Sequence, residues 1–134
     1  MVKSMILSKH ILWNLVKNKI MEVTIYHNPR CRKSREALSF LEEKSCKITV
    51  VEYLKDLLSI EELRALLNDL NIRPIELVRK NESIWKEQFK GRDLSDTAIL
   101  EAMVQNPKLI ERPIIKSKKG AVVGRPLERV KEVI

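Results

Sequence analysis

The sequence predicts an α/β fold in a single domain, because three stretches of its pattern point the same way. Residues 23–51 alternate between a β-branched run, an amphipathic stretch and a second apolar run, which predicts strand, helix, strand. Residues 59–103 have mainly helical spacing, and residues 114–134 return to short strands and a closing helix. A strand–helix–strand opening favours a parallel pair with the helix as crossover, and 134 residues suit one core.

The opening unit begins with a β-branched and aromatic run at residues 23–26, which stops at the turn signal Asn28-Pro29. In residues 31–43 apolar side chains recur at helical spacing among charged ones. A second apolar run, residues 48–51, follows a short polar break. We therefore expect a strand, a tight turn, a helix and a second strand.

The middle of the chain contains two helix starts. Ser59 precedes Glu62 by the three residues of a capping box, and a stripe of leucines follows. Ser95 opens a second apolar stripe, and the less regular stretch between the two helices contains Trp85 and Phe89. These patterns predict a helical insertion.

The last quarter reads as a β-hairpin and a helix. Residues 114–115 and 121–123 are apolar, and the polar residues 117–120 between them predict a turn. Pro126 suits the first turn of a closing helix over residues 127–134. The expected order is β-α-β, helical insertion, β-β-α.

The formal charge of +8 invites a nucleic-acid interpretation, but the distribution of charge opposes it. Four lysines and no acid in residues 1–20 account for +4, and most of the remaining chain alternates basic with acidic residues. Only six aromatic residues are present, and none interleaves a basic stripe. We expect no nucleic-acid partner, and a small anionic substrate accounts for the surplus charge equally well.

Two cysteines, Cys31 and Cys46, are too few for a disulfide framework, so a cytoplasmic location is expected. No stretch approaches the roughly 18 consecutive apolar residues of a membrane span. We expect a protein without a membrane partner that acts as a monomer.

Residues 1–20 differ in composition from the rest of the chain. Lys9, His10 and Asn14 interrupt the apolar run, and no small-residue cleavage site follows, which opposes a secretory signal. The absence of arginine opposes an organellar transit peptide. A peripheral amphipathic helix stays open, but we favour an N-terminal extension outside the core fold, which would comprise residues 21–134.

Cys31 is the candidate nucleophile. It follows a strand and the Asn-Pro turn at the expected start of a helix, where free N–H groups and the helix dipole favour a thiolate. His27 lies four residues upstream, and Ser34 falls one helical turn later, where its hydroxyl could donate to the sulfur. The segment also carries basic residues that we expect to acidify the thiol: Arg30, Arg32, Lys33 and Arg35.

Other interpretations of this segment fit its residues less well. A buried structural thiol is the commoner fate of a cysteine, but the surrounding segment is too polar to be buried whole. A phosphatase loop requires an arginine six residues after the cysteine, where Ala37 stands. Zinc requires about four ligands, more than this segment offers, so no metal is expected. Cys46 lacks a comparable setting and is interpreted as an incidental thiol.

Residues 26–34, Tyr-His-Asn-Pro-Arg-Cys-Arg-Lys-Ser, resemble the active-site loop of glutaredoxin-coupled arsenate reductases. Three arginine segments, residues 77–81, 110–114 and 124–126, resemble those of that family in the same order. The resemblance covers residues 21–134. The better-known bacterial members often run longer at the C-terminus and lack a counterpart of residues 1–20, which removes no matched position.

The resemblance implies a thioredoxin-like fold with a helical insertion and a cis bond between Arg112 and Pro113 that faces the cysteine loop. It implies that Cys31 is the nucleophile and that three arginines bind the oxyanion and stabilise its charge: Arg79, Arg112 and Arg125. The residues that match positions supporting the thiolate or binding substrate are His27, Asn28 and Ser34.

The resemblance further implies reduction of arsenate to arsenite, with glutathione as co-substrate, glutaredoxin as the protein partner and no bound cofactor. Ser34 occupies the place of a resolving cysteine, so an external thiol is required. Two alternatives stay open. One is an Spx-like redox regulator that binds RNA polymerase, and the other is a glutathione-linked thiol protein of the same fold with another substrate.

Overall fold

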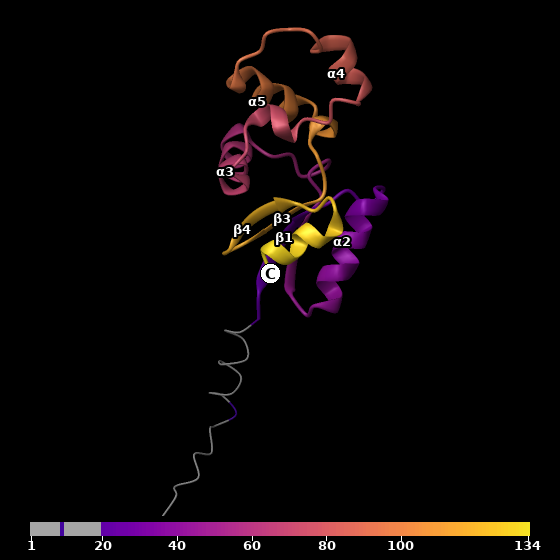
Figure 1. Ribbon diagram of the computed structural model, residues 1–134, viewed down its shortest axis with the longest axis vertical. Helices are drawn as coiled ribbons and strands as arrows, with labels where there is room; N and C mark the ends of the chain where they lie inside the picture. Colours follow the sequence, from indigo (N-terminus) through magenta and orange to yellow (C-terminus); the bar gives the residue numbers. More distant parts are fainter. Residues whose placement is uncertain (1–8, 10–19) are drawn as a thin grey trace, which may run out of the picture.

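The computed structural model describes Lys9 and residues 20–134, so nearly all of the predicted extension lies outside the described residues. The elements follow the expected order β-α-β, helical insertion, β-β-α (Figure 1). They are β1 (Glu22–Tyr26), α2 (Arg32–Glu43), β2 (Lys47–Val51), α3 (Ile60–Leu70), η1 (Pro74–Leu77), α4 (Ser83–Gln88), α5 (Asp96–Gln105), η2 (Pro107–Leu109), β3 (Ile114–Ser117), β4 (Gly120–Val123) and η3 (Leu127–Glu132), where η marks a 3-10 helix.

The sheet has the order β2-β1-β3-β4. β1 and β2 are parallel, with Tyr26 opposite Val51, and α2 is the crossover between them. β3 runs antiparallel to β1, with Ile25 opposite Ile115, and β4 runs antiparallel to β3. The carboxyl ends of β1 and β2 therefore meet at one edge of the sheet, and the chain leaves both strands there.

The sheet separates two hydrophobic clusters because successive strand residues point to opposite faces. Ile114 belongs to the cluster under the helical insertion, whereas its neighbour Ile115 belongs to the cluster under α2 and η3. Figure 1 accordingly shows α3, α4 and α5 beyond one face of the sheet, and α2 with the closing turn η3 beyond the other. The fold is a three-layer arrangement with the sheet in the middle.

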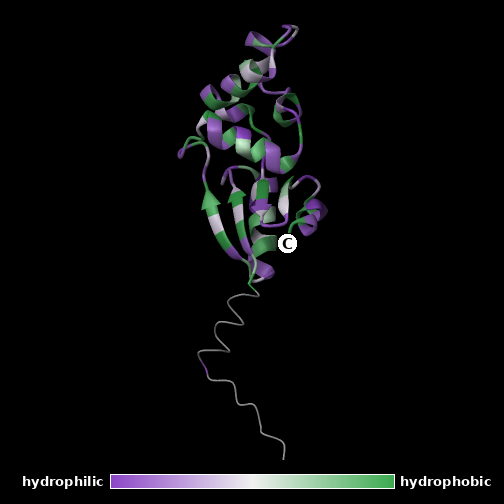
Figure 2. Ribbon diagram, turned by 90° about the vertical axis from the view of Figure 1, so that its left-hand side faces the viewer, coloured by the Kyte–Doolittle hydropathy of each residue, from purple (hydrophilic) through white to green (hydrophobic). Residues whose placement is uncertain are grey.

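The two predicted helix starts in the insertion are confirmed. The backbone N–H of Glu62 donates to Ser59 Oγ at 3.1 Å, and the Glu62 carboxylate in turn accepts a hydrogen bond from the backbone N–H of Ser59. Ser95 Oγ accepts from the backbone N–H of Ala98 at 3.2 Å. In Figure 2 hydrophobic and hydrophilic residues alternate along the helices, as expected for helices with one buried face. Among the described helices, none combines the length and the hydropathy of a membrane span.

The end of the chain differs from the prediction in two details. The hairpin loop has two residues rather than four, because Ser117 pairs with Gly120, which adopts φ +132°. The closing helix is a 3-10 helix that ends at Glu132, and Pro126 caps it in an extended conformation instead of occupying its first turn. Polar strand ends and short 3-10 turns have no apolar periodicity that would reveal them.

Candidate functional site

Cys31 is the N-cap residue of α2, one position before the helix begins. The turn that carries it is closed by two bonds to Asn28: its carbonyl accepts from the N–H of Cys31 and its Oδ1 accepts from the N–H of Arg30, each at 3.0 Å. The Arg35 guanidinium donates to the carbonyl of Pro29 at 2.9 Å. This short, internally bonded loop directs the sulfur to the N-terminal end of α2, as predicted.

His27 and Ser34 form a buried pair beneath the loop, with exposed fractions of 5% and 0%. Ser34 Oγ lies 2.6 Å from His27 Nδ1 and accepts from the backbone N–H of Asn28 at 3.0 Å. Burial lowers the pKa of His27, so its ring is neutral at pH 7 and its Nδ1 shares a hydrogen bond with the Ser34 hydroxyl, whose direction is set by the tautomer. The hydroxyl therefore holds the loop together, and among the described residues its partners are His27 and Asn28 rather than the Cys31 sulfur, which differs from the expectation.

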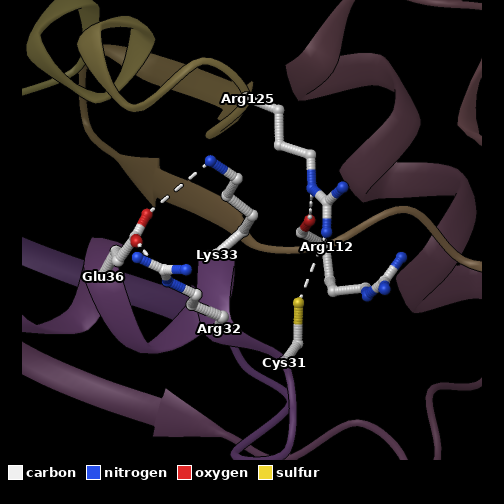
Figure 3. Close-up of polar contacts among 6 residues, drawn as sticks. All are labelled: Cys31, Arg32, Lys33, Glu36, Arg112 and Arg125. Carbon is white, nitrogen blue, oxygen red and sulfur yellow. Dashed lines mark hydrogen bonds and ion pairs between the residues drawn. The ribbon is translucent and has the colours of Figure 1, made fainter.

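Arg125 makes the direct contact with the Cys31 sulfur, although it lies 94 residues further along the chain. Its Nη2 donates to Cys31 Sγ at 3.3 Å, while its Nε donates to the carbonyl of Arg112 at 2.8 Å. The Arg112–Pro113 bond is cis, as the resemblance implies, and Arg125–Pro126 is cis as well. Figure 3 shows the Arg125 side chain reaching over the sulfur, with Arg112 beside it.

Arg112 completes a cationic pair with Arg125. Its Nε is buried and has no hydrogen-bond partner among the described residues. Within residues 20–134, neither Arg112 nor Arg125 forms an ion pair with a carboxylate, in contrast to Arg32, Arg73, Arg79 and Arg129. Two guanidinium groups without acidic partners thus converge on the sulfur, which leaves their charge available to an anion.

Arg79 is carried to the same region by backbone pairing. Val78 and Ile110 form an antiparallel bridge, and the N–H of Arg79 donates to the carbonyl of Leu109 at 2.7 Å. Its guanidinium donates to the Lys108 carbonyl at 3.1 Å and pairs with Glu82 at 3.3 Å. Arg79 therefore lies beside the segment that leads into Arg112, but it has an acidic partner and, among the described contacts, none with the sulfur.

The pKa of Cys31 is lowered, and the balance of causes identifies the groups responsible. Burial raises the pKa, but the backbone N–H groups of Ser34 and Lys33 and the charges of Arg112 and Arg125 outweigh it. The helix terminus and the two remote arginines together favour the thiolate. A thiolate beside guanidinium groups without acidic partners is the arrangement that nucleophilic attack on an anion requires.

The basic residues that flank Cys31 in the sequence do not have the acidifying role expected of them. Arg32 and Lys33 point toward Glu36, with which they form ion pairs at 3.1 Å and 3.9 Å (Figure 3). Neither their side chains nor those of Arg30 and Arg35 are among the causes of the lowered pKa of Cys31. Arg32 and Lys33 are therefore exposed charges on the surface of α2.

Cys46 is remote from this site. Both cysteines are free, and burial raises the pKa of Cys46. Cys31 follows the carboxyl end of β1, whereas Cys46 precedes the amino end of the parallel strand β2, so the two lie at opposite edges of the sheet. In the described part of the chain no group of three His, Cys, Asp or Glu residues could hold a metal ion.

Tyr53 is a site residue that the sequence analysis missed. It is 2% exposed, and its hydroxyl experiences the charges of Arg112, Arg79 and Cys31. The available signal was its position just past the carboxyl end of β2, where ligands bind in open α/β sheets. No motif marks a tyrosine there.

The chain is similar to a family of known proteins over almost the whole described domain. A model of the ArsC family matches residues 26–133. The uncharacterized protein YfgD of Escherichia coli K12 is 44% identical over 115 residues, which cover 84% of this chain and 97% of that protein. The arsenate reductase of Neisseria meningitidis serogroup B is 39% identical over 115 residues, covering 84% of this chain and 98% of that protein.

The fold has a close counterpart among solved structures. The structure of an arsenate reductase from Vibrio cholerae matches with a TM-score of 0.82 and 42% identity, covering 87% of this chain and all of that one (100%). The expected thioredoxin-like fold with a helical insertion is thereby confirmed.

Proposed function

The chain belongs to the ArsC family, and on this basis we propose that it is an oxidoreductase that reduces arsenate to arsenite. Cys31 is the nucleophile, and glutathione and glutaredoxin supply the electrons. The observation that carries the proposal is the 3.3 Å contact between Arg125 Nη2 and Cys31 Sγ, with the unpaired Arg112 guanidinium beside it.

Arsenate enters as a tetrahedral oxyanion, and guanidinium groups are suited to it because they offer several N–H donors in one plane. Arg112 and Arg125 have no carboxylate partner among residues 20–134, so an anion does not have to displace one. Arg79 would exchange Glu82 for the substrate, because its ion pair is half-exposed and weak. The three arginines then neutralise the charge that accumulates on the oxyanion during attack.

The reaction begins when the Cys31 thiolate attacks arsenic, forming a sulfur–arsenic bond as a protonated arsenate oxygen leaves as water. The thiol of glutathione then attacks the bound arsenic, forming a second sulfur–arsenic bond as its proton and an arsenic-bound hydroxyl group leave as water. When the two sulfur atoms form a disulfide, both sulfur–arsenic bonds break and two electrons stay on arsenic, which takes up water and leaves as arsenite. A glutaredoxin thiol attacks the glutathione sulfur of this mixed disulfide and regenerates Cys31.

The position of the second cysteine supports the use of an external thiol. Cys46 lies at the opposite edge of the sheet, and Ser34, one turn after Cys31, is bonded to His27. Neither can form a disulfide with Cys31 in this fold. A single-cysteine scheme with glutathione therefore agrees with the geometry.

The test is an arsenite-production assay with purified protein, glutathione and glutaredoxin. We expect turnover that depends on both reductants, complete loss in Cys31→Ser, and retention in the matched control Cys46→Ser. Absence of turnover in the wild-type protein with both reductants would refute the proposal. Specific binding to RNA polymerase in that case would favour the regulator.

A further inference from the structure

Tyr53 has a hydroxyl group without a hydrogen-bond partner among the described residues. The residue as a whole is only 2% exposed. In the part of the chain that the structure describes, the Nε of Arg112 is the one side-chain nitrogen or oxygen that is both fully enclosed and unpartnered, so the Tyr53 hydroxyl reaches solvent through the small exposed part of its residue. A tyrosine with a buried ring and an accessible, unpartnered hydroxyl offers a donor that a ligand can use.

The position of Tyr53 is fixed by the sheet. β1 and β2 are parallel and in register, so the loop from His27 to Cys31 and the segment after Val51 leave the same edge. The N–H of His27 donates to the carbonyl of Val51 at 2.8 Å, which joins the two exits. A tight turn follows, because the Glu52 carbonyl accepts from the N–H groups two and three residues beyond Tyr53, each at 2.9 Å.

The ring of Tyr53 is part of the buried cluster that carries the arginines. Val78, which directly precedes Arg79, belongs to the same cluster. So does Ile110, two residues before Arg112. The charged groups that act on the hydroxyl are Arg112, Arg79, the Cys31 sulfur and Glu111. The hydroxyl group thus lies among the groups that define the proposed substrate site.

The protonation state of Tyr53 suits a donor. Burial raises its pKa to about 12, although the nearby arginines oppose this effect. The phenol therefore keeps its proton at neutral pH, well below its own pKa. It offers a neutral, directional donor in a place where further positive charge would repel Arg112 and Arg125.

We propose that Tyr53 is a further substrate-binding residue, whose hydroxyl group donates a hydrogen bond to an oxygen of the tetrahedral oxyanion held between Arg112 and the Cys31 thiolate. This inference rests on the proposed function and extends its binding site. Tyr53 fixes the orientation of the anion, which the two guanidinium groups attract.

The experiment compares Tyr53→Phe with wild type, both in a Cys46→Ser background so that Cys31 is the only thiol. Alkylation of Cys31 by iodoacetamide is measured at increasing arsenate, and at increasing sulfate, which is tetrahedral but is not reduced here. We expect Tyr53→Phe to require about tenfold more of either anion for the same protection, because it loses one hydrogen bond to a charged group. KM for arsenate should rise in parallel.

Two controls separate binding from structure. The urea midpoint of Tyr53→Phe should equal that of wild type, because the hydroxyl makes no bond within the described protein. Tyr26→Phe is the matched control, because the charges that act on Tyr26 are Lys116, Glu62 and Asp69 instead of the site groups. It should leave protection unchanged.

Equal protection of Tyr53→Phe and wild type by both anions would overturn the inference. So would a lowered urea midpoint with unchanged protection, which would make the hydroxyl structural. Failure of the proposed function has a different signature, namely a wild-type protein that produces no arsenite.

Discussion

Replacing Arg125 by Ala removes two hydrogen bonds at once. The Nη2 group that donates to Cys31 Sγ at 3.3 Å is lost, and so is the Nε donor to the Arg112 carbonyl at 2.8 Å. The first loss acts on the nucleophile and its oxyanion. The second frees the backbone that precedes Pro113.

The magnitude follows from the kind of bond that is lost. A hydrogen bond to a charged group contributes about 1.5–3 kcal/mol. If the bond from Arg125 acts on the thiolate and the developing oxyanion, kcat/KM should fall about 10- to 150-fold, since 1.36 kcal/mol corresponds to tenfold. The pKa of Cys31 should rise, because the charge of Arg125 is one of the causes that lower it. Loss of the donor to the Arg112 carbonyl should reduce the free energy of unfolding by about 1 kcal/mol.

The assay measures steady-state arsenite production and the pH dependence of Cys31 alkylation for Arg125→Ala, Arg125→Lys and Arg129→Ala. Lysine keeps the charge but lacks the planar fork that contacts two acceptors, so its loss should be smaller than that of alanine. Arg129 pairs with Glu132 at 3.2 Å on the exposed side of η3 and is the matched control with wild-type behaviour. If Arg125→Ala kept the wild-type rate and alkylation profile, the assignment of Arg125 to the nucleophile would be wrong.

Three further changes test the structure around the loop. Ser34→Ala leaves His27 Nδ1 and the backbone N–H of Asn28 without their partner, so the free energy of unfolding measured in urea should fall by about 1–3 kcal/mol. Ser39→Ala, at an exposed position of the same helix, should change it by under about 0.5 kcal/mol. Gly124→Ala adds a Cβ 2.8 Å from Ile115 Cδ1 in a packed cluster and should destabilise the fold by about 1–2 kcal/mol in the same assay. Burial lowers the pKa of His27 below 6.5, so the unfolded chain binds the proton more readily. The free energy of unfolding should therefore fall as the pH drops below 6.5. A plot of urea midpoint against pH should be flatter in this range for His27→Gln than for wild type. An unchanged slope would contradict the prediction.

The parts of the fold that could be predicted are those with a repeating pattern. β1 and α2 follow from β-branched and helical spacing, and Pro29 marks the turn between them, so the sequence alone indicated Cys31 at a helix start. The capping box at Ser59 was predictable because it consists of hydrogen bonds between residues only three apart in the sequence. The arginines were identified only through the order of motifs that resemble a known family.

The long-range contacts of the site could not be predicted. Arg125 reaches Cys31 across 94 residues, and only the folded sheet reveals that this arginine, rather than Arg32, contacts the sulfur. Arg32 is next to Cys31 in sequence, but its side chain lies on the exposed surface of α2 and pairs there with Glu36. Tyr53 is similar, because its burial depends on packing against residues of the helical insertion that are distant in the sequence.

The central claim is that Cys31 is ionised at neutral pH by the helix terminus and the two arginines. Its most direct test is the rate of iodoacetamide alkylation as a function of pH in the Cys46→Ser protein, where a single thiol reacts. The midpoint should lie clearly below the roughly 8.5 of an ordinary cysteine. A midpoint at or above that value would contradict the account.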